Sequence, residues 1–212
     1  MNTQTISSGE HCPRCGLPKS HCICFQITPT TSEALFCLLL HEKEWQRETN
    51  TGHLIKALLP QTRLFTWQRN QPDPELIALL QNPDFDPYLI FPADRPELSH
   101  RAVSTVSKGN KRPLFLILDG TWKEARKIVR KSPYLDPLPL LSLTPQNLSR
   151  YSLRRNPDAS HLCTAEIAIE LLASQQSFNK QAGNEQQDTA QSLSLILDQF
   201  LDQYLRYKDR KA

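Results

Sequence analysis

Apolar runs alternate with amphipathic segments along the middle of the chain. Five of the runs are typical of β-strands: residues 34–40, 63–67, 88–91, 114–118 and 138–143. Between them, residues 51–59, 74–81 and 122–131 have the spacing of helices, and Asn50 or Thr51 can cap the first of these. Uninterrupted apolar runs are expected where both faces of a strand are buried. The pattern therefore predicts an α/β fold with a mostly parallel sheet and flanking helices on both faces.

The ends of the chain differ from this middle part. Residues 159–173 form a further amphipathic segment, and a stretch rich in Gln, Asn and Ser follows it. In the last segment the apolar residues stand three and four apart, which predicts a helix that packs on the domain. We therefore expect five parts: a disordered lead (1–10), a cysteine-rich module (11–28), the main domain (29–175), a linker (176–188) and a C-terminal helix (189–212).

Composition narrows the class of protein. The chain has 212 residues, of which 39% are hydrophobic and 22% charged, as in ordinary globular domains. Its longest apolar stretch, residues 34–40, is far shorter than the roughly 18 residues of a membrane span. The first ten residues are polar and contain no apolar segment like that of a secretory signal. We expect a cytoplasmic protein that does not enter a membrane and shows no obligate protein partner.

Four of the six cysteines form a cluster near the N-terminus, Cys12-x-x-Cys15 followed by Cys22-x-Cys24. In a chain without an export signal, such a cluster favours a metal site over disulfides. Zinc binds four such thiolates tetrahedrally, so we predict one structural zinc held by Cys12, Cys15, Cys22 and Cys24. His11 or His21 can replace one thiolate, and a labile disulfide or free surface thiols are the alternatives. The other two cysteines stand in apolar runs and are expected to be core thiols: Cys37 and Cys163.

The run at residues 113–118 leads directly into Asp119-Gly-Thr-Trp122 and then into a helix. A turn between a strand and a helix N-terminus is where open α/β sheets bind ligands. Asp119 is a candidate proton acceptor, a candidate ligand clamp, or the helix cap, and capping by Asp119 or Thr121 is common at such positions. Another polar residue, His41, follows the first strand, either as polar lining of a site or in an exposed loop.

Basic residues concentrate around this turn. Residues 101–131 contain nine basic residues against two acidic ones, Asp119 and Glu124. Such a run is either a solvated face or the binding surface for a polyanion. Because the net charge of the whole chain is only +3, this uneven distribution favours a polyanion.

The ordered series of motifs resembles one family. The matching pieces are Cys12-Pro-Arg-Cys15 with Cys22-Ile-Cys24; Leu39-Leu-His41 and Asn50-Thr-Gly52; Phe91-Pro92; Leu118-Asp-Gly-Thr-Trp-Lys-Glu-Ala-Arg126; and Tyr151-Ser-Leu-Arg-Arg155 leading to Leu162-Cys-Thr-Ala-Glu166. Together they resemble the DTW-domain family of tRNA-uridine aminocarboxypropyltransferases, from Cys12 to about Leu172. The chain departs from the usual family residues at four positions: Glu42, His53, Cys163 and Ala165.

This resemblance implies a SPOUT-like α/β fold, related to the knotted methyltransferases, with S-adenosylmethionine as co-substrate and tRNA as partner. It implies transfer of the 3-amino-3-carboxypropyl group to N3 of a uridine in the tRNA variable loop, with release of 5′-methylthioadenosine. Asp119 is then the general base or orients the nucleophile. The alternatives are an S-adenosylmethionine-dependent RNA methyltransferase and a non-enzymatic zinc-containing RNA-binding protein.

The same resemblance suggests which residues bind each substrate. Those expected at the donor are Phe91, Pro92, Asp119, Gly120, Thr121, Trp122, Leu141, Ser142, Leu143 and Thr164. Those expected at the tRNA are Lys123, Arg126, Lys127, Arg130, Lys131, Tyr151, Arg154 and Arg155. Thr164 and Glu166 either fix the amino or carboxylate group of the donor or serve as helix cap and surface charge. Tyr151 either stacks on a flipped base or packs in the core.

Overall fold

A computed structural model describes residues 11–107, 109–143, 149–153, 161–176 and 185–209. The chain divides into two compact units. The first unit consists of Met1–Ser32, Trp45–Pro60 and Pro145–Ala212, and the second of Glu33–Glu44 and Gln61–Thr144. The expected disordered lead and most of the expected linker lie outside the described residues.

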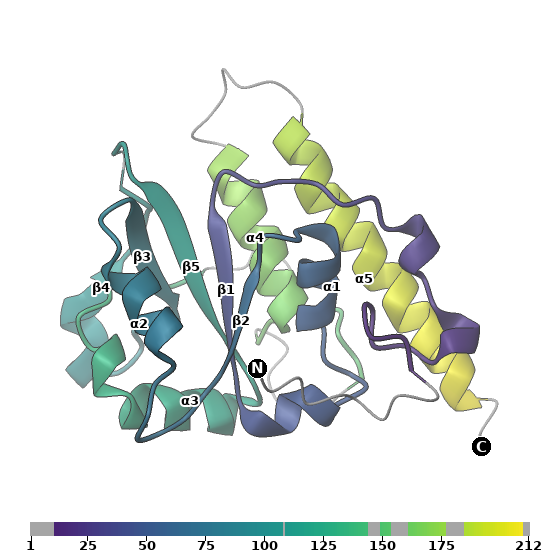
Figure 1. The fold of residues 1–212 in the computed structure, drawn as a ribbon, viewed down its shortest axis with the longest axis horizontal. Helices are drawn as coiled ribbons and strands as arrows, with labels where there is room; N and C mark the ends of the chain where they lie inside the picture. The colour runs from purple at the N-terminus through teal and green to yellow at the C-terminus, as the bar shows by residue number, and fades with distance from the viewer. Residues whose placement is uncertain (1–10, 108, 144–148, 154–160, 177–184, 210–212) are drawn as a thin grey trace. The chain divides into compact units, whose positions relative to one another are not determined.

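The second unit contains a six-stranded sheet (Figure 1). Its strands are β1 (Leu35–Leu40), β2 (Arg63–Thr66), β3 (Phe85–Ile90), β4 (Ala102–Val103), β5 (Arg112–Asp119) and β6 (Leu140–Leu141). Their order is β2-β1-β5-β3-β6-β4, and every pairing among the described strands is parallel. This confirms the predicted mostly parallel α/β sheet. The two-residue strand β4 is the one strand that the hydrophobic pattern did not predict.

Two helices of the second unit pack on one face of this sheet. They are α2 (Pro74–Gln81) and α3 (Trp122–Lys131), with the bounds that the sequence predicted. Leu76 of α2 and Ile128 of α3 are fully buried in one cluster with alternate residues of the strands, such as Leu39 and Leu116. Alternation follows from the pleat of a strand, which directs every second side chain to the same face.

The opposite face of the sheet is also buried, which explains why the strands are apolar without interruption. Phe36 of β1 and Phe115 of β5 contact each other edge to face, with ring centres 5.5 Å apart, and both are almost fully buried. Short 3-10 helices complete the connections: η3 (Glu42–Gln46), η4 (Pro96–Arg101) and η5 (Pro133–Leu135).

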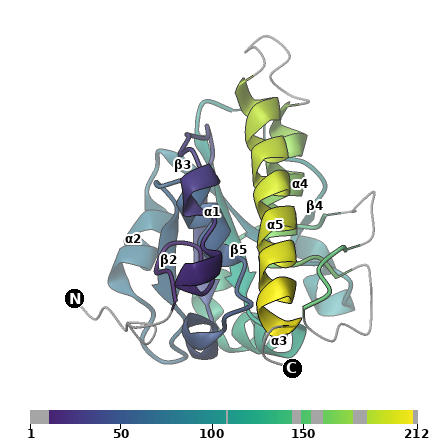
Figure 2. The same cartoon turned by 90° about the vertical axis from the view of Figure 1, so that its right-hand side faces the viewer.

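The first unit is helical. Its helices are η1 (Lys19–His21), η2 (Cys24–Gln26), α1 (Gly52–Leu58), α4 (Thr164–Gln176) and α5 (Glu185–Asp209). The helices α4 and α5 run side by side, and both contact α1 (Figure 2). The predicted apolar stripe of the last helix is buried: Leu193, Ile196, Leu197, Phe200, Leu201 and Tyr204.

The ends of these helices differ slightly from the prediction. Helix α5 begins at Glu185, so four residues assigned to the linker belong to the helix. At the start of α1, the Asn50 side chain accepts a hydrogen bond from Gly52 N at 2.7 Å, whereas Thr51 makes no such capping bond. Across the described part of the chain, every helix is too short or too polar to cross a membrane.

Candidate active site and metal centre

The strands β1 and β5 lie next to each other at the point where the order of the sheet reverses. From β1 the chain continues to β2 on one side, and from β5 it continues through α3 to β6 on the other. Ligands of open α/β sheets bind outside the carboxyl ends of the strands at such a switch point. Here the two ends are aligned, because Leu40 pairs with Asp119 and His41 N donates to Asp119 O at 2.9 Å.

Asp119 is the last residue of β5 and is 2% exposed. The cap of the following helix is a different residue, Thr121. Its hydroxyl accepts a hydrogen bond from Glu124 N, and the Glu124 carboxylate accepts from both Thr121 N and the Thr121 hydroxyl at 2.8 Å. This reciprocal capping box satisfies the N-terminus of α3. Thr121, and not Asp119, therefore caps α3. The roles that stay open for Asp119 are those of proton acceptor and ligand clamp.

Gly120 lies between these two residues in the chain, at a position where a side chain would have little room. A Cβ atom at this position would lie 3.1 Å from the Cβ of Glu124 and 3.6 Å from that of His41. The first distance is shorter than an ordinary van der Waals contact. A larger residue here would therefore require Glu124 to shift by a few tenths of an ångström.

The loops expected at the donor come together at the same edge of the second unit. The Ser142 hydroxyl, just after β6, accepts a hydrogen bond from Ala93 N at 3.0 Å and donates to Phe91 O at 3.4 Å. The rings of Phe91 and Trp122 lie 6.2 Å apart, which joins the end of β3 to the start of α3. Pro92 and Leu143 are half-buried beside these loops, and Leu141 is buried in β6.

Thr164 belongs to the first unit, where it is the first residue of α4. Nearby Glu166 is buried, and its carboxylate accepts hydrogen bonds from Cys163 N, Arg150 N and the Ser149 hydroxyl at 2.7 to 2.8 Å. Of its two predicted roles, the structure supports capping, because this carboxylate closes the start of α4. It also holds the segment that leads to Tyr151.

Tyr151 is half-buried, and its hydroxyl donates to Thr49 O at 2.6 Å. This bond supports the packing role over base stacking. Arg150 pairs with Asp198 of α5 at 2.9 Å. The two further arginines expected at the tRNA, Arg154 and Arg155, lie outside the described residues.

Helix α3 has one apolar and one basic face. Ala125, Ile128 and Val129 are buried, whereas the exposed positions are Lys123, Arg126, Lys127 and Arg130, with Lys131 half-buried. The Lys127 ammonium lies 5.3 Å from the centre of the Trp67 ring, within the range of a cation–π contact.

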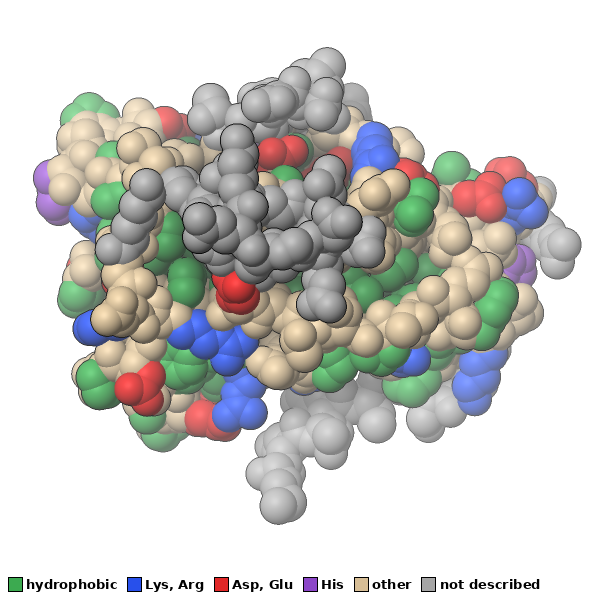
Figure 3. Space-filling view, turned by 90° about the horizontal axis from the view of Figure 1, so that it is seen from above, with side chains coloured by type: hydrophobic (Ala, Val, Ile, Leu, Met, Phe, Trp, Pro, Cys, Tyr) green, Lys and Arg blue, Asp and Glu red, His purple; other side chains and the backbone are tan. Residues whose placement is uncertain are grey.

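Two of the nine basic residues in this region have structural tasks that the sequence did not reveal. Arg101 donates to the carbonyl groups of Leu135 and Leu138, and Arg112 donates to those of Glu33 and Ala34. Among the described residues, the face shown in Figure 3 has Lys and Arg only in small separate groups between acidic and uncharged side chains. The basic character of residues 101–131 therefore rests mainly on α3.

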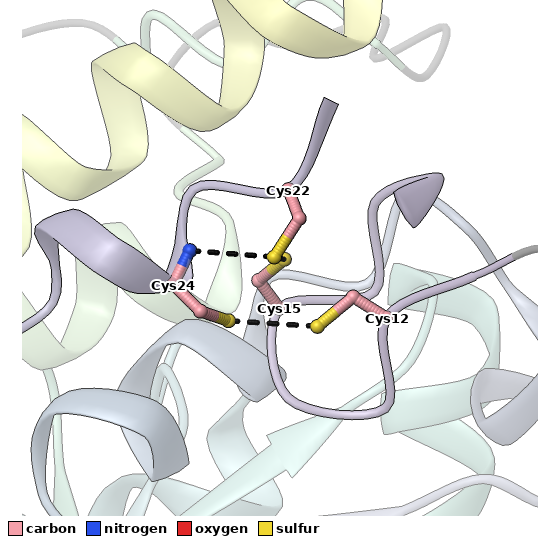
Figure 4. Close-up of side chains that lie close together, drawn as sticks. All are labelled: Cys12, Cys15, Cys22 and Cys24. Atoms are coloured by element: carbon pink, nitrogen blue, oxygen red, sulfur yellow. Dashed lines mark hydrogen bonds between the residues drawn. The ribbon is translucent and has the colours of Figure 1, made fainter. Parts of the chain in front are cut away.

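The four clustered cysteines converge in the first unit, as Figure 4 shows. All four sulfur atoms lie within 4.8 Å of one another, with Cys12 and Cys24 at 3.5 Å and Cys15 and Cys22 at 3.8 Å. Zinc–sulfur bonds of about 2.3 Å in a tetrahedron give sulfur–sulfur distances of about 3.8 Å. The donor set and its spacing therefore fit a zinc ion. The fit depends on Gly16, whose φ of 79° lets the chain turn after Cys15.

The four thiols influence one another's acidity. Burial opposes ionisation of Cys12, but backbone N–H groups of Cys15 and Arg14 and the neighbouring thiols outweigh it and lower the Cys12 pKa to about 7. Burial raises the pKa of Cys15 to about 11, and repulsion from Cys12 and Cys22 adds to the rise. Burial and the contact with Cys12 likewise raise the pKa of Cys24. Four thiolates this close need a cation to be stable together.

Neither histidine takes a place in this cluster. Among the described residues, the side chains grouped closely enough to share one ion are the four cysteines. His11 instead pairs with Glu48 at 3.2 Å, and both His11 and His21 pack edge-on against the Tyr207 ring of α5. Of the remaining cysteines, Cys37 is buried as predicted, whereas Cys163 is half-buried just before α4. Burial raises the pKa of both thiols to about 12.

The chain is similar to known proteins. The model of the DTW domain matches residues 9–205. A protein of Drosophila melanogaster named tRNA-uridine aminocarboxypropyltransferase 2 is 27% identical over 176 residues, which covers 76% of this chain and 65% of that protein. The chain thus spans less than two thirds of the length of this relative. No solved structure matches the chain.

Proposed function

Because the chain belongs to the DTW-domain family, we propose that it is a tRNA-modifying transferase. In this proposal it moves the 3-amino-3-carboxypropyl group of S-adenosylmethionine to N3 of a uridine in the tRNA variable loop. The observation that carries the proposal is the family match across both units, with Asp119-Gly-Thr-Trp122 at the switch point of the sheet. The name of the Drosophila relative supports it. An enzyme with these substrates would work in the cytoplasm.

The reaction requires one bond to form and one to break. The uridine N3 attacks the methylene carbon beside the sulfonium, and the carbon–sulfur electron pair returns to sulfur. The sulfonium thereby becomes the neutral thioether 5′-methylthioadenosine, and the N3 proton must leave. Because the sulfonium charge already activates this leaving group, the reaction itself needs no catalytic metal. The protein must supply orientation and a proton acceptor.

Asp119 is the proposed acceptor or orienting group for the uridine imide. It is a buried carboxylate at the carboxyl end of a central strand, and Thr121 relieves it of the capping role. The imide N3–H is about as weak an acid as a tyrosine phenol. An ordinary carboxylate is therefore a far weaker base than the imide anion that loss of this proton would leave. Correct placement of the imide therefore contributes to the rate together with proton acceptance.

The donor is proposed to bind against the loops at the ends of β3, β5 and β6. The aromatic rings of Phe91 and Trp122 suit an adenine ring, and the backbone at residues 119–122 and 141–143 offers hydrogen-bonding groups. Thr164 is the proposed contact of the methionyl arm. The choice of the methylene carbon over the methyl carbon of the sulfonium is a matter of how this arm is oriented.

The tRNA is proposed to dock on the basic face of α3 through its phosphates. The described residues of that face are Lys123, Arg126, Lys127, Arg130 and Lys131. Arg154 and Arg155 of the first unit are proposed as further phosphate contacts, and Tyr151 as a residue that holds their segment through its bond to Thr49 O. The cysteine cluster is proposed to hold one structural zinc, because four thiolates leave no ligand position for water.

Mass spectrometry of nucleosides tests this function. Unmodified tRNA is incubated with the full chain and S-adenosylmethionine, digested, and analysed. We expect a uridine heavier by one 3-amino-3-carboxypropyl group, together with 5′-methylthioadenosine. A product heavier by one methyl group would make the protein a methyltransferase. Binding of tRNA without product, and without binding of S-adenosylmethionine in calorimetry, would make it an RNA-binding protein.

A further inference from the structure

His41 occupies a central position at the switch point of the second unit. It directly follows β1, is 4% exposed, and extends the ladder to β5 through its bond to Asp119 O. A buried polar ring is costly unless its nitrogen atoms find partners. His41 Nδ1 lies 3.5 Å from two groups: Oε1 of Glu124 in α3, and the backbone N–H of Lys43, which donates to it.

The Glu124 carboxylate has two separate tasks. Its Oε2 accepts hydrogen bonds from both Thr121 N and the Thr121 hydroxyl, so the helix cap is complete without Oε1. Oε1 is the oxygen that reaches His41. Gly120 lies between these two side chains, close to the Cβ atoms of both. His41 and Glu124 therefore flank the turn that carries Asp119.

One face of the His41 ring lies against Trp67. The two rings are nearly parallel, with centres 5.8 Å apart, and Trp67 N donates to Leu40 O at 2.7 Å at the end of β1. The Trp67 indole donates to the Ser132 hydroxyl at 2.8 Å, at the C-terminal end of α3. The two stacked rings thus contact both ends of α3. His41 contacts Glu124 at the start of the helix, and Trp67 donates to Ser132 at its end.

We propose that His41 is a positioning residue of this site: through Glu124 it fixes the turn that carries Asp119, and through Trp67 it sets the direction of α3. The inference rests on the proposed function for its effect on the reaction. It adds a residue to which neither the family match nor the relative assigns a role. An error of about 1 Å in the placement of a reacting group can lower a rate about a hundredfold, so loss of this support should appear in kcat.

The test compares three substitutions of His41 in the full chain. The Phe variant keeps a ring that can stack on Trp67 but loses the contact with Glu124. Asn and Gln both lose the ring, and their amides reproduce the positions of Nδ1 and Nε2 respectively. We expect His41→Phe and His41→Gln to lower kcat at least about tenfold with the KM for tRNA nearly unchanged, and His41→Asn to recover the part of the loss that comes from the Glu124 contact. Glu42→Gln, an exposed neighbour, is the control and should retain full kcat.

Several results would overturn the inference. Full activity of His41→Phe would do so. A loss of kcat that parallels the fall in melting temperature across all three variants would also do so. Recovery by Gln instead of Asn would show that Nε2 acts, and that the contact with Glu124 does not matter. A second readout needs no activity: Glu124→Gln should shift the NMR resonance of His41 Nδ1, and an unchanged resonance argues against the contact. A wild-type chain without product refutes the proposed function and leaves this readout valid.

Discussion

Three successive residues at the end of β5 have three different tasks. Asp119 places a buried carboxylate at the strand end, Gly120 allows the close approach of Glu124, and Thr121 caps the helix. The division of labour follows from size and chemistry, because a cap needs a hydroxyl or carboxylate acceptor and a close approach needs the absence of a Cβ. The role proposed for Asp119 in the reaction therefore does not compete with helix capping.

Substitution of Asp119 tests that role. Asp119→Asn has almost the same volume but no basic carboxylate, so we expect product formation to fall by about a hundredfold or more. Melting temperature and metal content should stay close to those of the wild type. The control Asp84→Asn, an exposed position at the opposite end of the sheet, should be fully active. Turnover of Asp119→Asn near the wild-type rate would eliminate the role of Asp119 as base.

Sequence reasoning identified Asp119 but not His41 or the partners of the arginines. The strand–turn–helix pattern around Asp119 is local, so its position could be predicted. The sequence does not decide whether His41 lines a site or lies in a loop, because Glu124, which it contacts, lies 83 residues further along the chain. Arg101 and Arg112 were counted as surface charge, since a sequence does not show which carbonyl groups a guanidinium will reach.

At the scale of elements, α3 combines the features of a binding helix with those of a structural one. Its apolar side enters the core with Ile128, and its opposite side exposes four basic residues. Both helices of the second unit were predicted with correct ends, because caps and apolar spacing are encoded locally: Thr121 caps α3 and Asp73 caps α2. The strand β4 was missed because two residues carry no periodicity and their pairing with β6 is nonlocal.

The basic face of α3 predicts how tRNA binding responds to salt. The double variant Lys127→Ala/Arg130→Ala removes two candidate phosphate contacts. We expect weaker binding of all tRNAs alike and a plot of log affinity against log salt that is shallower by about one to two units. Filter binding or fluorescence anisotropy across a salt titration measures this. Arg206→Ala/Lys208→Ala on α5 is the charge-matched control, and equal slopes for both double variants would contradict the role of α3.

At the scale of the whole molecule, the two units have different means of stabilisation. The second unit relies on a sheet buried on both faces. In the first unit, the cysteine module and the last turns of α5 support each other, since Tyr207 packs against His11 and His21 and the Tyr204 hydroxyl lies 3.5 Å from Glu48. A metal in the module would therefore also stabilise the end of α5.

Removal of the metal tests this coupling. We expect one zinc per chain by elemental analysis, and chelation to lower the melting temperature of the first unit by at least about 10 °C. Hydrogen exchange should accelerate in the cysteine module and around Tyr207, and remain slow in β1 and β5. Cys12→Ser should reproduce the effect, whereas Cys37→Ala should keep its metal. Unchanged exchange around Tyr207 after metal loss would show that α5 is independent of the module.

The sequence alone determined the features that depend on neighbours in the chain. These are the longer strands and the helices, the four-cysteine cluster, the turn with Asp119 and the basic face of α3, because periodicity, caps and short spacings are local. Tertiary structure decided which distant groups meet: His41 with Glu124, Arg101 with the carbonyl of Leu138, and Glu166 with the segment before Tyr151. Only the folded chain brings such groups within bonding distance, so burial and hydrogen bonding assign their roles.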